Sequence, residues 1–217
     1  AAIPRGRIGF EKLSAEMPYF KESTYIDEEL RQELNIVLET GNQAYIDSVM
    51  NRIFDDEMRL LRGARASRER MRMQALTTGI VAMASNGQAF TYDYGIPAAN
   101  KVTAQVSWSD HTNSDPIEDI RQLKENIYQS TGYVIERAMC DQATWRHIRA
   151  NEKIKAEIFA LKSTVGAITD SMLRDYISDQ LDGLVVKVNE KRYVDESGAT
   201  VAFMPADTFV MFPGTAL

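Results

Sequence analysis

The run from Ala44 to about Thr78 has the residue spacing of one long helix, and it constrains the fold more than any other segment. Apolar side chains recur along it at intervals of three or four residues, in an imperfect stripe of Tyr45, Val49, Ile53, Leu60, Leu61, Ala64, Met71 and Leu76. Gly63 inside the run costs about 1 kcal/mol of helix stability relative to Ala. Gly79 stands where a glycine commonly follows the last helical turn. The sequence therefore predicts a helix that ends at Gly79.

Arginines crowd the last turns of this helix. We call the following six residues the arginine stripe: Arg59, Arg62, Arg65, Arg68, Arg70 and Arg72. A spacing of three residues keeps Arg59, Arg62 and Arg65 on one side of a helix. Such a basic stripe contacts either acidic groups on a protein surface or the phosphates of a nucleic acid. We favour ion pairs within or between proteins, and we keep contact with nucleic acid as the alternative.

The composition limits the protein classes that fit. The chain has 217 residues, which suits one large domain or two small ones, and 44% of them are hydrophobic, which is enough for a core. The formal net charge of −6 argues against a dedicated DNA-binding domain, because such domains are usually basic. Cys140 is the sole cysteine, so no disulfide can form within the chain. No apolar run approaches the roughly 18–20 residues of a membrane span.

The remaining pattern mixes helices and strands. The predicted helices cover Glu28–Glu39, about 15 residues from Pro116, Ala143–Ile148, Asn151–Leu161 and Ser171–Leu181. The predicted strands cover Val102–Trp108, Tyr133–Ala138, Leu184–Val188, Lys191–Val194, Val201–Met204 and Thr208–Phe212. Asn86-Gly87 between two β-prone runs predicts a hairpin. Because these elements do not alternate regularly as strand and helix, the sequence predicts the α+β class.

Signatures of catalysis and of cofactor binding are absent from the sequence. It contains no GxxxxGK[ST], no GxGxxG and no GxSxG. His111 and His147 have no other His or Cys at ligand spacing, so we expect no metal site. Cys140 precedes a predicted helix, where a thiol pKa can fall, but without an obvious basic neighbour we expect a small buried residue. We therefore expect no enzyme and no cofactor.

Three stretches carry a resemblance to a known family. They contain, in order, Arg68, Glu69, Met71, Gln74, Ala75, Leu76 and Gly79; then Trp108-Ser109, Asp115-Pro116, Asp119 and Ile120; then Tyr193, Gly198, Phe203, Pro205, Asp207 and Gly214. In their order and spacing they resemble the major capsid proteins of lambda-type tailed phages, the phage capsid protein E family. The similarity extends over nearly the whole chain from about Arg5.

The resemblance implies the HK97-type shell fold, with a long spine helix, peripheral β-strands and a mixed axial domain. Residues 1–25 would be a remnant of the extended loop. Residues 26–110 would form the peripheral (P) domain, with the spine helix at about 44–79, and residues 111–217 would be mostly axial (A) domain. The N-terminal arm and the outgoing half of the extended loop have no counterpart here. We therefore expect a piece of a longer protein, truncated at both ends.

The resemblance also implies a function. It predicts a structural protein that self-assembles, as hexamers and pentamers, into an icosahedral shell enclosing double-stranded DNA. The implied location is the virion capsid, assembled in the bacterial host cytoplasm, with packaged DNA at the inner face, no membrane partner, and a scaffold or decoration protein left open. The candidate intersubunit contacts are Arg59, Arg62, Arg65, Arg68 and Arg72. The alternative is a nucleic-acid-binding module that uses the arginine-rich helix, residues 59–72.

Overall fold

The computed structural model describes residues 28–41, 43–85, 88–161, 167–195 and 197–214. The chain divides into two compact units, residues 1–63 and residues 64–217. The first unit contains α1 (Glu28–Thr40) and the beginning of α2 (Gln43–Thr78), which continues into the second unit as one helix of 36 residues. Both helices have the predicted bounds to within one residue. The segment 1–25, predicted to be an extended-loop remnant, lies outside the described residues.

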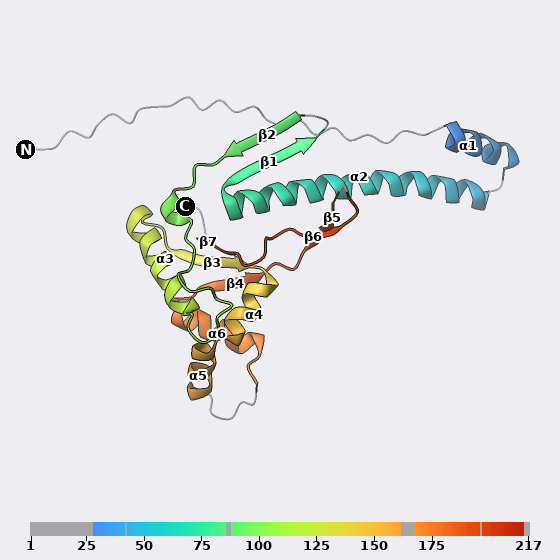
Figure 1. Cartoon of the computed structure of the whole chain (residues 1–217). Coiled ribbons are helices and arrows are strands. Elements are labelled where there is room, and N and C mark those ends of the chain that lie inside the picture. The colour runs from blue at the N-terminus through green and yellow to red at the C-terminus, as the bar shows by residue number, and fades with distance from the viewer. Residues whose placement is uncertain (1–27, 42, 86–87, 162–166, 196, 215–217) are drawn as a thin grey trace, which may run out of the picture. The chain divides into compact units, whose positions relative to one another are not determined.

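The second unit combines the end of α2 with a mixture of helices and strands (Figure 1). In chain order these are β1 (Ile80–Ser85), β2 (Gln88–Asp93), η1 (Ala98–Asn100), α3 (Pro116–Thr131), β3 (Ile135–Cys140), α4 (Gln142–Ala150), α5 (Glu152–Leu161), α6 (Asp170–Gln180), β4 (Val185–Val188), β5 (Arg192–Val194), β6 (Thr200–Ala202) and β7 (Phe209–Pro213). The strands form a β1–β2 pair, a β4–β3–β7 sheet and a β5–β6 pair. The fold is therefore α+β, as predicted.

The predicted hairpin forms directly after α2. Strands β1 and β2 pair antiparallel, from Ile80 opposite Asp93 to Ser85 opposite Gln88. This register leaves two residues for the loop, which agrees with the hairpin that the sequence predicts there. The loop residues Asn86 and Gly87 themselves lie outside the described part of the chain.

The core of the second unit lies between the three-stranded sheet and the helices α3 to α6 (Figure 1). Strand β3 is central, parallel to β4 and antiparallel to β7. Its side chains alternate, so that Ala138 and Cys140 are buried and Arg137 is exposed. The core cluster consists of Ile117, Ile120, Ile135, Ala138, Cys140, Trp145, Ile148, Ile154, Ile158, Leu173, Tyr176, Ile177, Leu181, Leu184 and Val186. Each large apolar side chain buried in this way stabilises the fold by about 1.5–3 kcal/mol.

The ends of α3 follow the signals in the sequence. The side chain of Asp115 accepts a hydrogen bond from the Glu118 amide at 3.2 Å, and Pro116 occupies the first turn. At the other end Gly132 has a φ of 75° and donates its amide to the Tyr128 carbonyl at 2.7 Å. A side chain at this left-handed position would be strained, so Gly132 is suited to end the helix.

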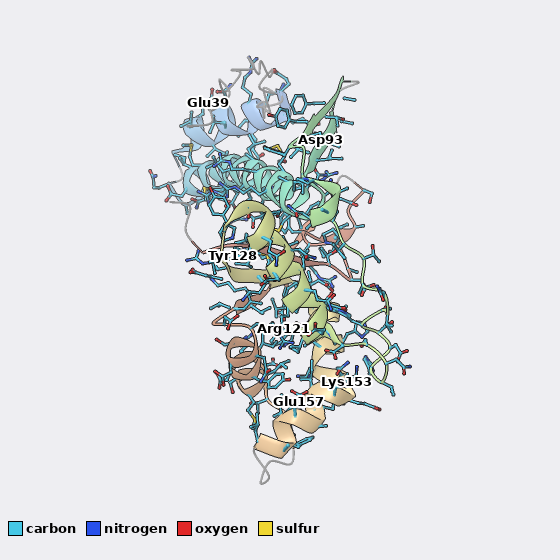
Figure 2. The ribbon with its side chains drawn as sticks, turned by 90° about the vertical axis from the view of Figure 1, so that its left-hand side faces the viewer. Glu39, Asp93, Arg121, Tyr128, Lys153 and Glu157 are labelled. Atoms are coloured by element: carbon cyan, nitrogen blue, oxygen red, sulfur yellow. The ribbon has the colours of Figure 1, made fainter. Side chains whose placement is uncertain are left out.

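Polar contacts join the helices around this core. Lys153 on α5 lies 3.3 Å from the Asp115 carboxylate at the start of α3. The Tyr176 hydroxyl on α6 donates a hydrogen bond to Glu157, which is labelled with Lys153 on α5 in Figure 2. Arg149 on α4 lies 3.1 Å from Asp170 at the start of α6. These directional contacts help to orient helices that also pack against one another through the apolar core.

The predicted strand over Val102–Trp108 is wrong. These residues run as an irregular segment, in which Val102 and Val106 are 61% and 40% exposed. Trp108 is held by side-chain contacts instead: its Nε1 donates to Asp119 of α3 at 2.8 Å, and its ring meets Phe209 of β7 edge-on at 5.5 Å. Alternation of apolar residues marks a strand only where a neighbouring strand takes its hydrogen bonds, and no strand among the described residues pairs with this segment.

Two other strands, β3 and β6, differ from their predicted bounds by up to two residues, whereas β4, β5 and β7 differ by one. Strand β3 begins at Ile135 rather than at Tyr133, because Tyr133 and Val134 follow the end of α3 and are more than half exposed. Strand β6 ends at Ala202 rather than at Met204, whose side chain is buried at 2% exposure. In both cases the apolar run extends beyond the part that pairs with a neighbouring strand.

Asp141 provides a test of this packing, because its buried carboxylate joins α4 to the segment before β7. It accepts hydrogen bonds from the amides of Ala143 at 2.8 Å, Thr144 at 3.3 Å and Thr208 at 3.2 Å. Asp141→Ala removes a helix cap and leaves a distant amide without its partner, so we expect it to lower the free energy of unfolding by about 2–4 kcal/mol. Urea unfolding of the purified protein measures this loss.

Thr169→Ala is the matched control. Thr169 also caps a helix, but it is exposed and accepts one backbone amide, from Met172 at 3.4 Å. We expect a loss of about 1 kcal/mol or less. Equal losses for the two variants would contradict the linking role of Asp141.

Candidate interaction surface

One side of the last turns of α2 presents arginines to the solvent. Arg65, Arg68 and Arg72 are all exposed, and their spacing of three and four residues places them on the same side of the helix. Leu76, four residues further along, is 41% exposed on that side. We call Arg65, Arg68, Arg72 and Leu76 the arginine face. Within the part of the chain that the structure describes, Arg65 and Arg68 make no hydrogen bond or ion pair.

The two remaining candidates for intersubunit contact, Arg59 and Arg62, belong to the first unit. Their side chains are exposed as well. All five candidates that the sequence singles out are therefore exposed. Arg65, Arg68 and Arg72 belong to the second unit, which contains the core.

Arg70 differs from the rest of the arginine stripe because it points toward strand β5. Its guanidinium lies 6.0 Å from the centre of the Tyr193 ring. The pKa of the neighbouring Asp195 is lowered, chiefly by the hydrogen bond from the Ser197 side chain and the one from the Ala199 amide, and the charge of Arg70 adds to this. Arg70 is thus used within the subunit, whereas Arg65, Arg68 and Arg72 point outward.

Glu69 supplies a second link between α2 and the segment around β5. Its carboxylate is 23% exposed and lies 3.7 Å from Arg72 and 3.3 Å from Lys191. Asn189, two residues before Lys191, directs its side-chain amide at the sulfur of Met73 at 3.4 Å. Exposed ion pairs of this kind contribute about 0–1 kcal/mol each, so they orient the helix more than they stabilise it.

The end of α2 is also fixed by the turn at Gly79. This residue has a φ of 74°, and a Cβ atom there would lie 2.8 Å from Cδ1 of Ile96. Its carbonyl accepts the Tyr94 amide at 2.8 Å, and the Gln74 side chain accepts the Ala82 amide at 3.3 Å. Only glycine combines this backbone conformation with this close approach, which accounts for its place in the sequence.

The two histidines come together in a way that the sequence does not reveal. Nε2 of His111 lies 3.1 Å from Nδ1 of His147, and the other nitrogen of His147 is 3.9 Å from Asp207. The two residues are 36 positions apart, so no local spacing signals the contact. No group of three or more His, Cys, Asp or Glu side chains among the described residues could hold a metal ion.

Cys140 is buried in the core, as predicted from the sequence. Burial raises the pKa of its thiol to about 12, and the negative charge of Asp141 contributes to the same shift. The reactive form of a cysteine is the thiolate, which a thiol with this pKa does not populate near neutral pH. Cys140 is therefore a packing residue and not a nucleophile.

Comparison with known proteins gives a family and a fold. The family described as phage major capsid protein E matches the whole chain, residues 1–217, and its members are structural proteins rather than enzymes. No curated protein matches the sequence. Across the described residues, no helix has both the length and the apolar composition needed to cross a bilayer.

Among solved structures, the chain is similar to a candidate capsid protein of a prophage of Escherichia coli CFT073. The two share 19% sequence identity with a TM-score of 0.54, over 89% of this chain and 54% of the other. The present chain thus spans about half the length of that protein, and the likeness shows a shared fold. A phage-related protein from Bordetella bronchiseptica RB50 is 18% identical over 47% of this chain and 30% of its own, with a TM-score of 0.35.

The different surroundings of Arg70 and Arg68 predict different effects on the β5–β6 pair. Arg70→Ala removes the cation above Tyr193, so we expect the amides of β5 and β6 to exchange with deuterium about twofold to fivefold faster, as for the loss of about 0.5–1 kcal/mol. Arg68→Ala is the matched control, and we expect it to leave this exchange unchanged. Equal effects of the two variants would show that Arg70 does not hold the strand pair.

The raised pKa of Cys140 predicts an alkaline loss of stability. The folded pKa of about 12 exceeds the ordinary value of 9.0, so the protonated thiol favours the folded state. This contribution is fully present below pH 9.0 and is lost as the pH rises toward 12. We expect urea unfolding midpoints to fall less steeply with pH above 9.0 in Cys140→Ala than in the natural sequence. Parallel pH profiles would contradict the shift.

Proposed function

The chain belongs to the phage major capsid protein E family, and we propose that its full-length parent is the major head subunit of a tailed phage or prophage. Copies of the parent associate as hexamers and pentamers into an icosahedral shell that encloses double-stranded DNA. In this proposal the shell has the HK97-type fold, with α2 as the spine helix, residues 26–110 as the peripheral domain and residues 111–217 as most of the axial domain. Assembly takes place in the cytoplasm of the bacterial host, and the virion capsid is the final location.

The observation that carries the proposal is the family match over residues 1–217. The exposed arginine face supports it, because a shell subunit needs surfaces that contact other copies. The net charge of −6 also fits, since an acidic subunit avoids non-specific adhesion to the polyanion it encloses.

The arginine face, together with Arg59 and Arg62, supplies contacts at the seams between subunits in this proposal. Arginine suits such seams because its planar guanidinium can pair with both oxygens of a carboxylate. A single exposed ion pair contributes only about 0–1 kcal/mol. Symmetry repeats each contact in every copy of the shell, so weak pairs together set the geometry and the rate of association.

A nucleic-acid-binding module that uses residues 59–72 is the second candidate function. The exposed positions of Arg65 and Arg68 favour it, since neither has a partner among the described residues. The acidic charge of the chain weighs against it. DNA affinity of the isolated chain that falls steeply with salt, and that is lost in Arg65→Ala/Arg68→Ala, would favour this function over the structural one.

Electron microscopy of the full-length parent, co-expressed with its neighbouring genes, tests the proposal. We expect closed shells of uniform diameter from the natural sequence. For Arg62→Glu/Arg65→Glu we expect folded subunits with the circular dichroism spectrum of the natural protein and no shells, because both reversals place negative charge at an acidic seam.

Lys101→Glu/Arg146→Glu is the matched control for this experiment. It makes the same change in charge at two exposed positions outside α2, and we expect it to form shells. Normal shells from Arg62→Glu/Arg65→Glu would contradict the role of the arginines. A natural parent that stays a soluble monomer or dimer would contradict the capsid function itself.

A further inference from the structure

Helix α1 has an exposed face whose charge is opposite to that of the arginine face. Glu28, Glu29 and Glu39 are exposed, and Ile36 among them is 60% exposed. At 100° per residue these four side chains lie within about one third of the helix circumference. Val37, which is fully buried, lies on the opposite side. We call Glu28, Glu29, Ile36 and Glu39 the acidic face; Figure 2 labels Glu39 on α1.

We propose that the acidic face of α1 in one copy docks on the arginine face of α2 in a neighbouring copy. This inference rests on the proposed function, and it adds the identity of the surface that the arginines contact. The two faces match in chemistry. The acidic face carries three carboxylates, of which Glu28 also pairs with Arg31 of α1 at 3.0 Å. The arginine face carries three guanidinium groups, of which Arg72 also pairs with Glu69 at 3.7 Å. Each face contains one large exposed apolar side chain, Ile36 at 60% and Leu76 at 41%.

The two faces also match in length. Glu28 to Glu39 and Arg65 to Leu76 each span the same number of helical positions, which corresponds to about 17 Å along a helix axis. Two helices that lie side by side can therefore cover each other's charged face from end to end. The pairing buries Ile36 and Leu76 at the same contact, which adds an apolar component that salt does not screen.

Since the proposed function requires contacts between copies, we assign the partner of each face to a second copy of the chain.

The proposed contact is heterologous, since the two faces lie on different parts of the subunit. Each copy offers its acidic face to one neighbour and its arginine face to another. Contacts of this type generate rings when the rotation between neighbours closes. Hexamers and pentamers of a shell are such rings, so a single type of contact, repeated around each ring, fits the proposed assembly.

A charge exchange between the two faces tests the inference in the full-length parent. We expect Arg68→Glu/Arg72→Glu and Glu29→Lys/Glu39→Lys each to lower the yield of shells by about tenfold or more, because each places like charges across the contact. The variant with all four substitutions restores opposite charges, and we expect its shell yield to return to within about twofold of the natural protein.

The outcomes separate the inference from the proposed function. If the natural parent and Glu29→Lys/Glu39→Lys both form normal shells, the inference is wrong and the capsid function stands. The same conclusion follows if the variant with all four substitutions forms no more shells than the variants with two. If only the arginine variant is impaired, and the shells that it still forms contain no DNA, the arginine face contacts nucleic acid and the inference is wrong. A natural parent that forms no shells overturns the proposed function first.

Crosslinking provides a second measurement that does not depend on charge. In shells of Ile36→Cys/Leu76→Cys treated with a short bis-maleimide, we expect a ladder of covalent multimers on denaturing gels. The buried Cys140 does not take part. The single variants Ile36→Cys and Leu76→Cys are the controls, and we expect no ladder from either. Monomers alone from the double variant would overturn the proposed contact, since only a link between two copies produces a multimer.

Discussion

The attachment of the end of α2 to the strands that follow it determines what the helix presents to the outside. Arg70 lies over Tyr193, Glu69 lies between Arg72 and Lys191, and the turn at Gly79 fixes the direction of the chain. Once these contacts set the rotation of the helix about its axis, the period of 3.6 residues places Arg65, Arg68 and Arg72 outward. These intramolecular contacts together thus determine which arginines point outward.

Much of the fold follows from local signals in the sequence. Asp115, Asp141 and Gly132 mark helix ends because capping depends on hydrogen bonds to neighbouring amides and on a left-handed φ, both of which are local. The segment Val102–Trp108 was mispredicted because a strand needs a partner strand, and its own residues do not encode one. Contacts such as Trp108 with Asp119, and His111 with His147, join distant positions and need the folded structure to be seen.

The candidate surface was predicted in part for the same reason. A spacing of three residues identified the arginine stripe, and its five candidate residues are exposed in the structure. Their role in contact between subunits stays a prediction. The sequence could not separate Arg70 from the others, because its partner Tyr193 lies more than a hundred positions away. Nor could it show that Glu28, Glu29 and Glu39 of α1 are exposed, since exposure needs the folded structure.

We propose that the outward arginines of α2 lie at the seams between copies of the subunit. A cryo-electron microscopy reconstruction of shells of the full-length parent, at a resolution that shows side chains, would test this placement. We expect the guanidinium groups of Arg68 and Arg72 at salt-bridge distance from carboxylates of another copy. Side chains that face the lumen or the outer solvent, with no neighbouring subunit beside them, would contradict the proposal.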